Sequence, residues 1–309
     1  MASESAAVLG SNNEEQKMRE MKARAGRAIG VDNFMTGVFY VVAGFFLALL
    51  IALASYIIIK GFAGAKPYMF AFDSQGIGNQ FWNTIYLVFL SLLISVPIGV
   101  MAGIYMALYA KKGRVATILR IAIETLSSLP SIVVGLFGYL VFIVMTGNSW
   151  NLFAGALAVS ILSLPLIATT TEDAINMLPD SYTKGAFGMG ATKRQVITTV
   201  LLPAATPHII TGVILAAGRG FGEAAALLYT AGMSTDLNWH MVSAATNPFN
   251  PFRPGETLAL NIWALRTEAL RADAAEMANL SSAILMILVL GFSLLAHTIE
   301  RHMKKKSGV

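Results

Sequence analysis

The sequence predicts an all-α integral membrane protein with six membrane-spanning helices. Of its 309 residues, 56% are hydrophobic and 13% are charged, whereas soluble domains carry about 25% charged residues. About 20 apolar residues cross the ~30 Å hydrocarbon core of a bilayer. Six stretches approach or exceed that length: 34–59, 82–109, 121–145, 152–171, 208–231 and 280–298. Backbone groups in lipid must pair internally, and the sequence lacks the short alternating strands of a barrel, so these stretches are predicted to be helices.

The first span follows a mostly polar segment, residues 1–33, which is expected to be cytoplasmic. Within it, residues 14–30 have the pattern of a short amphipathic helix, which could lie along the membrane, on a partner, or in solvent. The first apolar stretch is too long for the 7–15-residue core of a cleavable signal peptide. The membrane domain is then expected to cover residues 34–300, followed by a cytoplasmic tail, residues 301–309.

The Lys and Arg residues predict how the chain is oriented in the membrane. Sixteen lie in the N-terminal segment, the second and fourth connections and the C-terminus, and five lie in the remaining connections. By the positive-inside rule, both termini are cytoplasmic. The net charge of +5 lies along these membrane flanks, so it reports topology and lipid surroundings, and no nucleic-acid partner is expected.

Two spans carry packing signals. Gly99 and Gly103 have the G-x-x-x-G spacing that allows a neighbouring helix to approach closely. In the third span, Pro130 should kink the helix, and nearby serine hydroxyls can pair with the freed backbone groups.

An external loop is expected at residues 232–279. Asn-Pro and Arg-Pro pairs in its first half are turn signals. Residues 256–278 have the spacing of a helix on the external face. Such a helix could be available to an external partner or simply pack against the bundle, and the two are compatible.

A polar stretch, residues 180–212, lies between two apolar runs and is predicted to form a helix, a turn and a second helix. Asp180 or Ser181 can cap the start of the first helix with a side-chain oxygen. Gly188 and Gly190 are predicted to end it, because glycine adopts left-handed dihedrals without a Cβ clash.

The second of these helices is predicted to start at Thr192 and to close at Pro203, which lacks the N–H that would continue it. This stretch resembles the cytoplasmic signature of ABC importer permeases, E-A-A, three residues, G, nine residues, I-x-L-P. The residues that take up this signature and its turn are Lys184, Gly185, Ala186, Gly190, Ala191, Val200, Leu202 and Pro203.

The resemblance implies a type I ABC importer permease fold, in which this stretch is a cytoplasmic coupling helix that docks into a groove of the ATPase subunit. We call residues 180–206 the coupling loop. Lys184 and Gly185 replace the leading Glu-Ala of the signature, and an acidic residue in the ATPase groove would accommodate the lysine. The alternative is an ordinary polar loop between two helices.

Arg219 and Glu223 are charged residues within the fifth span. They are four apart, so they are expected to share one helix face. A charge in a span costs about 2.5–3.5 kcal/mol on insertion scales and usually faces the protein interior or water. Either the two form a structural ion pair, or Arg219 lies on an anion pathway with Glu223 holding it.

No catalytic or metal site is predicted, because the sequence has no P-loop, no G-x-S-x-G and no metal-binding spacing of its four histidines. The absence of cysteine excludes disulfides and thiolate chemistry. The chain is therefore expected to move a solute with energy supplied elsewhere and without a cofactor of its own. The resemblance to ABC importer permeases implies that ATP and Mg²⁺ are bound by the partner ATPase.

A second resemblance concerns the substrate. The segments 129–138 and 222–231 are similar to blocks of the PstA family of phosphate importer permeases, and the similarity covers roughly residues 80–300. Ala224 departs from the family's threonine, and Thr169 stands where the family has an arginine. The second departure puts one anion contact in doubt, and a partner permease could supply it.

This resemblance implies a phosphate importer in a bacterial or archaeal cytoplasmic (inner) membrane. Its expected partners are a homologous PstC-type permease, a PstB-type ATPase dimer and an extracytoplasmic PstS-type phosphate-binding protein. Two alternatives stay open: a permease for another oxyanion, such as molybdate or sulfate, and a six-span scaffold or receptor with no ATPase.

Overall fold

The computed structural model describes residues 2–110, 113–241, 244–268 and 271–307. Within these ranges the regular structure is helical. The chain divides into two compact units, Met1–Tyr56 and Ile57–Val309.

Helix α1 covers Ala2–Ala63. Its residues up to Tyr56 form the first unit, and its last residues belong to the second unit. Its apolar part, Ile29–Ala63, is long enough to span a membrane, and none of the residues in its most apolar stretch is buried. The separate helix predicted for residues 14–30 is instead part of α1. No proline precedes Pro67, so no residue before it lacks the N–H that continues a helix.

The second unit contains the other long apolar helices. They are α2 (Gly78–Leu108), α5 (Leu152–Asn176), the run Lys193–Phe221 and α11 (Ala274–Ser307, apolar to Met303). With α1, five helices of the described residues are long and apolar enough to span a membrane, or six if one bent pair counts as a span. The six predicted spans therefore correspond to helices of the structure, each with shifted ends.

The third predicted span, 121–145, is a bent pair rather than one kinked helix. Helix α3, Arg114–Ser128, meets the segment Ser131–Val144 at an angle of 101°. This segment is α4, Ser131–Gly138, which continues as the π-helix η2, Tyr139–Val144. Leu129 and Pro130 are extended at the break. Proline lacks an N–H and disfavours helical dihedrals in the residue before it, so the predicted kink is a complete interruption.

The fifth predicted span, 208–231, starts earlier and ends earlier than expected. It is built from α7 (Lys193–Gln195), the π-helix η3 (Val196–Leu201) and α8 (Leu202–Phe221), and a break separates it from α9 (Ala225–Thr230).

Pro203 does not close a helix, as the sequence predicted, but lies in the first turn of α8. Just before it the Leu202 N–H bonds to the Ile197 carbonyl, a wider turn than an α-helix has. The chain thus continues through the proline, since a proline is tolerated in a first helical turn and π-bulges relax the pattern around it.

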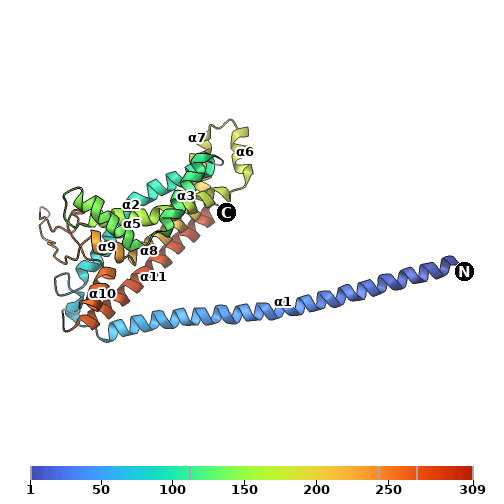
Figure 1. Cartoon of the computed structure of the whole chain (residues 1–309), viewed down its shortest axis with the longest axis horizontal. Coiled ribbons are helices and arrows are strands. Elements are labelled where there is room, and N and C mark those ends of the chain that lie inside the picture. The colour runs from blue at the N-terminus through green and yellow to red at the C-terminus, as the bar shows by residue number, and fades with distance from the viewer. Residues whose placement is uncertain (1, 111–112, 242–243, 269–270, 308–309) are drawn as a thin grey trace. The chain divides into compact units, whose positions relative to one another are not determined.

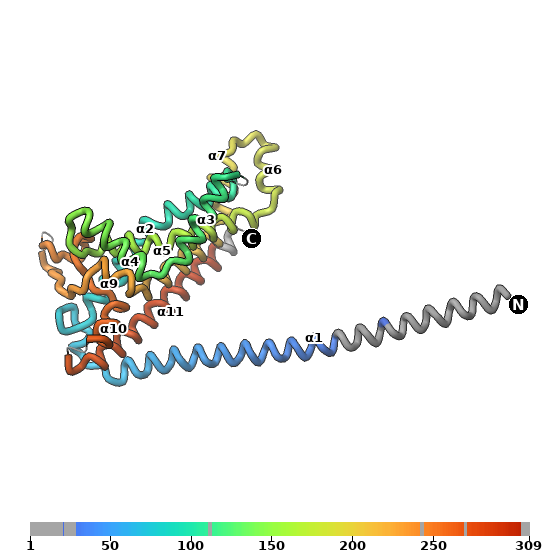
Figure 2. Tube along the Cα trace, in the orientation of Figure 1, coloured from blue at the N-terminus to red at the C-terminus, as the bar shows by residue number. Residues whose placement is uncertain are grey.

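Helix α5 forms the centre of the second unit and packs against α2, α8, α3, α4 and α9. Figures 1 and 2 show these helices side by side, with α11 running along the bundle. A Cβ on Gly99 would lie 2.8 Å from the Ile167 Cβ, and one on Gly103 would lie 2.6 Å from the Ala168 carbonyl oxygen. The close helix approach predicted from the G-x-x-x-G spacing is confirmed.

The external loop contains a shorter helix than predicted. Helix α10 covers Leu258–Thr267, α11 starts at Ala274, and a short 3-10 helix, η1 (Pro67–Phe70), packs nearby. Leu258 of α10 belongs to a buried cluster with Met69 and Leu280. One face of α10 thus packs against the bundle.

Candidate coupling and translocation sites

The first helix of the coupling loop is α6, Asp180–Gly188, and its start differs from the prediction. Pro179 is the N-cap residue, and neither Asp180 nor Ser181 caps the helix through its side chain. The Asp180 carboxylate lies 3.2 Å from the Lys184 ammonium, one turn along, and both side chains are exposed. Asp180 sits in the first turn, where a negative charge interacts favourably with the helix dipole.

The end of α6 is a Schellman motif centred on Gly190. Gly190 has φ of +80°, and its N–H bonds to the Phe187 carbonyl at 2.9 Å, while the Ala191 N–H bonds to the Ala186 carbonyl at 3.1 Å. This pair of bonds satisfies carbonyls that a helix end leaves free. The prediction for Gly190 is confirmed, and Gly188 is the last helical residue.

The second part of the coupling loop begins at Thr192, as predicted. Thr192 and Gln195 form a reciprocal capping box, with the Thr192 N–H donating to Gln195 Oε1 at 2.8 Å. The Lys193 ammonium lies 3.5 Å from the ring centroid of Tyr109, at the end of α2. The coupling loop is thereby attached to a second membrane helix.

The turn of the coupling loop forms a concave surface, which encloses a hollow of about 410 Å³. It is lined by Ala186, Met189, Gly190, Ala191, Gln195, Thr199 and Val200. Met189 is 90% exposed, and Phe187 is also exposed. Four of the eight residues predicted for ATPase coupling lie on this surface, Lys184 and Gly185 are exposed on α6, and Leu202 packs into the bundle.

The coupling loop and the external loop lie at opposite ends of the second unit (Figure 1). α6 and α7 project from one end, where Ala107, Ala174 and Ala205 form a buried cluster of α2, α5 and α8. α9 and α10 lie toward the other end.

Arg219 and Glu223 do not share a helix face, contrary to the prediction. Helix α8 ends at Phe221, so Glu223 lies in the break, where its carboxylate accepts a hydrogen bond from the Ala226 N–H at 3.1 Å. Glu223 is buried and Arg219 is exposed. Among the described residues, no acidic side chain forms an ion pair with Arg219, so Glu223 does not hold it.

An ion pair that the sequence did not predict joins α3 to α5. An Arg120 guanidinium nitrogen donates to Glu172 Oε1, and the arginine side chain is 57% exposed while the glutamate is 8% exposed. Sequence reasoning counted Arg120 only as a flanking cation. The signal in the sequence that could have indicated this pair is Glu172 itself. It is an acidic residue at the end of an apolar run, and such a residue needs a charged or polar partner.

A second unpredicted feature is a buried arginine in the external loop. Arg253 is 3% exposed, and its guanidinium donates to the Asn83 Oδ1 at 2.8 Å and to the carbonyls of Asn247, Pro248 and Pro254. Burial lowers the pKa of Arg253 to about 10. The sequence showed this residue only as part of a turn signal.

Glu256 continues this buried network. Its carboxylate accepts hydrogen bonds from Gln80 and Asn261, each at 3.0 Å. Burial raises the pKa of Glu256, and the two amide hydrogen bonds oppose that rise. Together with Arg253, it joins the part of the external loop that precedes α10 to α2 and to α10 itself.

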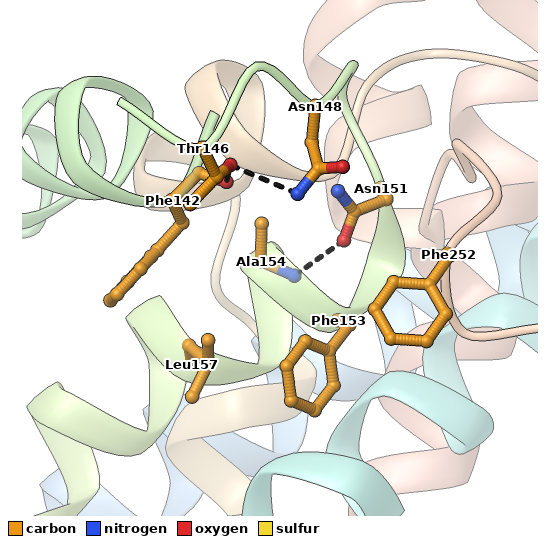
Figure 3. Close-up of a pocket in the computed structure, with 8 residues that line it drawn as sticks. All are labelled: Phe142, Thr146, Asn148, Asn151, Phe153, Ala154, Leu157 and Phe252. Carbon is orange, nitrogen blue, oxygen red and sulfur yellow. Dashed lines mark hydrogen bonds between the residues drawn. The ribbon is translucent and has the colours of Figure 1, made fainter. Parts of the chain in front are cut away.

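A small pocket near the start of α5 is shown in Figure 3. Its volume is about 130 Å³, below the roughly 300 Å³ at which ligand pockets begin. Asn151 caps α5 by accepting from the Ala154 N–H at 2.8 Å, and the rings of Phe153 and Phe252 lie together at one side. The pocket is part of the join between α5 and the external loop. Within the described ranges, no three His, Asp or Glu side chains gather as a metal site requires.

A bundle of membrane-length helices with a projecting helical loop at one end defines a class of protein, the multi-span helical membrane proteins. Solved structures share this architecture. A chain of a bacterial alginate ABC transporter aligns with a TM-score of 0.61 at 16% identity, over 90% of this chain and 98% of that one. A chain of the MetNI methionine ABC transporter, in an inward-facing conformation, aligns with a TM-score of 0.56 at 19% identity, over 77% and 99%. The fold is thus the type I ABC importer permease fold.

Residues 99–307 match the family of binding-protein-dependent transport system inner membrane components, and the chain belongs to that family. It is 43% identical over 285 residues to the probable ABC transporter permease protein YqgI of Bacillus subtilis (strain 168), covering 89% of this chain and 97% of the relative. It is 30% identical over 269 residues to the phosphate transport system permease protein PstA of Yersinia pestis, covering 82% and 88%. The predicted family of permeases is confirmed, and the chain is a multi-pass inner-membrane protein.

Proposed function

We propose that this chain is a permease subunit of an ATP-driven phosphate importer and forms half of its translocation pathway. The observation that supports an anionic substrate is Arg219. It is an exposed guanidinium on a membrane-spanning helix, with no acidic partner among the described residues. A permanent cation in a span is costly unless it faces protein or water. The relative named PstA, 30% identical over most of its length, supports phosphate as the anion.

Arg219 suits phosphate chemically. Its guanidinium is charged at any physiological pH and presents a planar fork that can bind two phosphate oxygens at once. Glu223 contributes to the same pathway differently: it fixes the break between α8 and α9 by accepting from the Ala226 N–H. The break then determines where the helix that carries Arg219 ends.

The coupling loop is the proposed contact with the ATPase. Its exposed apolar residues, Phe187 and Met189, lie on a segment outside the predicted bilayer, and exposed apolar surface of this kind is typical of interaction sites. Docking places this loop, and with it both termini, in the cytoplasm. ATP and Mg²⁺ are bound by a PstB-type ATPase dimer.

The remaining partners follow from the same proposal. A PstC-type permease completes the pathway, and a PstS-type binding protein delivers phosphate at the opposite end, near the external loop. ATP-driven closure of the ATPase dimer moves the coupling loops, and the membrane helices alternate between outward and inward access. Such an equilibrium shifts only by the difference in affinity of the ATPase states for the two conformations.

The direct test is phosphate uptake by cells that lack their own phosphate transporters and express the complete system. Wild-type chain should restore growth at low phosphate, and Arg219→Gln should abolish uptake while the complex still assembles. Arg219→Lys is the matched control and should retain part of the uptake, because it keeps the charge but not the fork. Normal uptake by Arg219→Gln would show that Arg219 does not take part in the pathway.

The same cells distinguish the alternatives. Uptake of molybdate or sulfate, with no phosphate uptake, would indicate a permease for another oxyanion. Purification without any ATPase subunit would indicate a scaffold or receptor.

A further inference from the structure

Helix α3, the first half of the bent pair, carries a polar stripe. Thr117, Arg120, Glu124 and Ser128 are spaced by three or four residues, which places them on one helix face. All four are exposed on this chain. The two hydroxyls donate to carbonyls of their own helix, so they are satisfied without a partner, whereas the two charges need water or protein beside them.

Arg120 is only partly engaged by its counter-ion. A guanidinium has five N–H donors, and the structure shows one hydrogen bond from it, to Glu172 on α5. The arginine side chain is 57% exposed, while the carboxylate is 8% exposed. The buried acid therefore fixes the arginine from one side and leaves donors available on the open side.

Arg120 lies closer to the coupling loop than Arg219 does. Glu172 is next to Thr171 and Thr170, and Thr170 is in close contact with Gly212 of α8. Arg219 follows Gly212 by seven residues, or about 10 Å along a helix with a rise of ~1.5 Å per residue. Through Glu172, Arg120 is thus attached to α5 at a level nearer the coupling loop than Arg219 on α8.

We propose that Arg120 is a second anion-binding side chain of the pathway, on the coupling-loop side of Arg219, with Glu172 as the residue that positions it. The ligand class is a small inorganic oxyanion, and the inference rests on the proposed function for phosphate itself. The carboxylate offsets part of the arginine's charge, so the site binds the anion weakly enough to release it, as conduction requires.

The test is ATP-driven phosphate uptake by the complete transporter reconstituted in vesicles, measured over a range of phosphate concentrations. Arg120→Gln should raise the KM for phosphate about tenfold, which corresponds to about 1.4 kcal/mol of lost binding. Arg120→Lys should raise it less. Thr117→Val, one turn away on the same stripe, is the control and should leave KM within about twofold of wild type.

Glu172→Gln separates anion binding from a purely structural clamp. If the pair positions an anion site, this variant frees the charge of Arg120, so the KM for phosphate falls and the maximal rate falls with slower release. If the pair only joins α3 to α5 or meets the partner permease, the thermal stability of the complex falls and KM stays unchanged.

The outcomes separate the two proposals. No phosphate uptake by the wild-type transporter would contradict the proposed function. Uptake by wild type with an unchanged KM in Arg120→Gln would overturn only the role of Arg120. If Arg120→Gln fails to assemble, Arg120→Lys decides: a raised KM in its assembled complex supports the site, and an unchanged KM rejects it.

Discussion

Gly190 controls the geometry of the coupling loop at the level of a single residue. Its φ of +80° is strained for residues with a side chain, yet a Cβ added there would meet no atom within 4 Å. A substitution therefore acts through the backbone alone. The cost of left-handed dihedrals is roughly 1–2 kcal/mol for an ordinary residue.

Gly190→Val should reduce the phosphate transported per ATP hydrolysed, because a β-branched residue favours a different turn and moves the docking surface. Gly190→Asn is the matched control, since asparagine tolerates left-handed dihedrals. Uptake and ATP hydrolysis are measured together in vesicles. Equal coupling ratios in Val and Asn variants would show that this turn does not transmit the motion.

Glu256 makes the stability of the external loop depend on pH. Its pKa is raised in the folded protein, mainly by burial, above the ordinary value of 4.5. As the pH rises through this interval, the unfolded chain loses its proton before the folded one does, so folding becomes less favourable. The contribution of Glu256 to folding stability is fully present when the pH is below the ordinary pKa, and it is lost as the pH rises through the raised pKa.

Glu256→Gln should remove that decline, since the amide has no proton to lose and its oxygen can still accept from Gln80 and Asn261. The Tm of the purified protein, measured from about pH 4 to about pH 8, should fall less steeply in the variant than in wild type. The two proteins should agree best at the acidic end. A wild-type Tm that is flat, or that rises more than that of the variant, would contradict the assigned direction.

At the scale of elements, the contact between α2 and α5 depends on glycine. A Cβ on Gly103 would lie 2.5 Å from the Thr171 Cβ, closer than atoms can approach without a shift of the helices. Extra volume in a packed core typically costs about 1–3 kcal/mol.

Gly103→Leu should therefore lower the Tm of the purified complex and reduce its yield. Gly291→Leu in α11 is the matched control, because no atom lies within 4 Å of a Cβ at Gly291 and the residue is exposed. Thermal unfolding in detergent compares the two. A Gly103→Leu complex as stable as its control would indicate that the helices lie farther apart than the structure shows.

Local signals predicted several elements well. Thr192 capped its helix, Gly190 made the left-handed turn, and Pro130 interrupted the third span, because each acts through its own backbone or its nearest neighbours. Pro203 was misread, since a wide π-helical turn before it lets the helix continue. The effect of a proline depends on the turn in which it lies, and the sequence does not reveal that turn.

Contacts between distant residues were the part that the sequence could not predict. Arg120 and Glu172 are 52 residues apart, and Arg253 bonds to Asn83 across 170 residues. Periodicity shows which face of a helix a residue occupies, but not which other helix that face meets. Arg219 and Glu223 are a different case: they were paired in the prediction because they are four residues apart, but the helix ends at Phe221 and separates them.

At the scale of the whole molecule, the central claim is that the coupling loop transmits ATP-driven motion from a separate subunit to the membrane helices. The chain has no cysteine, so a single introduced cysteine reports on one position without background. Met189 is 90% exposed at the turn of the loop, and it is the natural site for such a probe.

The most direct test is cross-linking of Met189→Cys to a cysteine in the ATPase subunit of the assembled transporter. We expect the cross-link to form with the ATPase and to stop ATP-driven phosphate uptake. Reduction of the cross-link should restore uptake. We also expect an impermeant maleimide to reach this cysteine only from the cytoplasmic side of sealed vesicles. Labelling from the external side, or a cross-link that leaves uptake unchanged, would contradict the account.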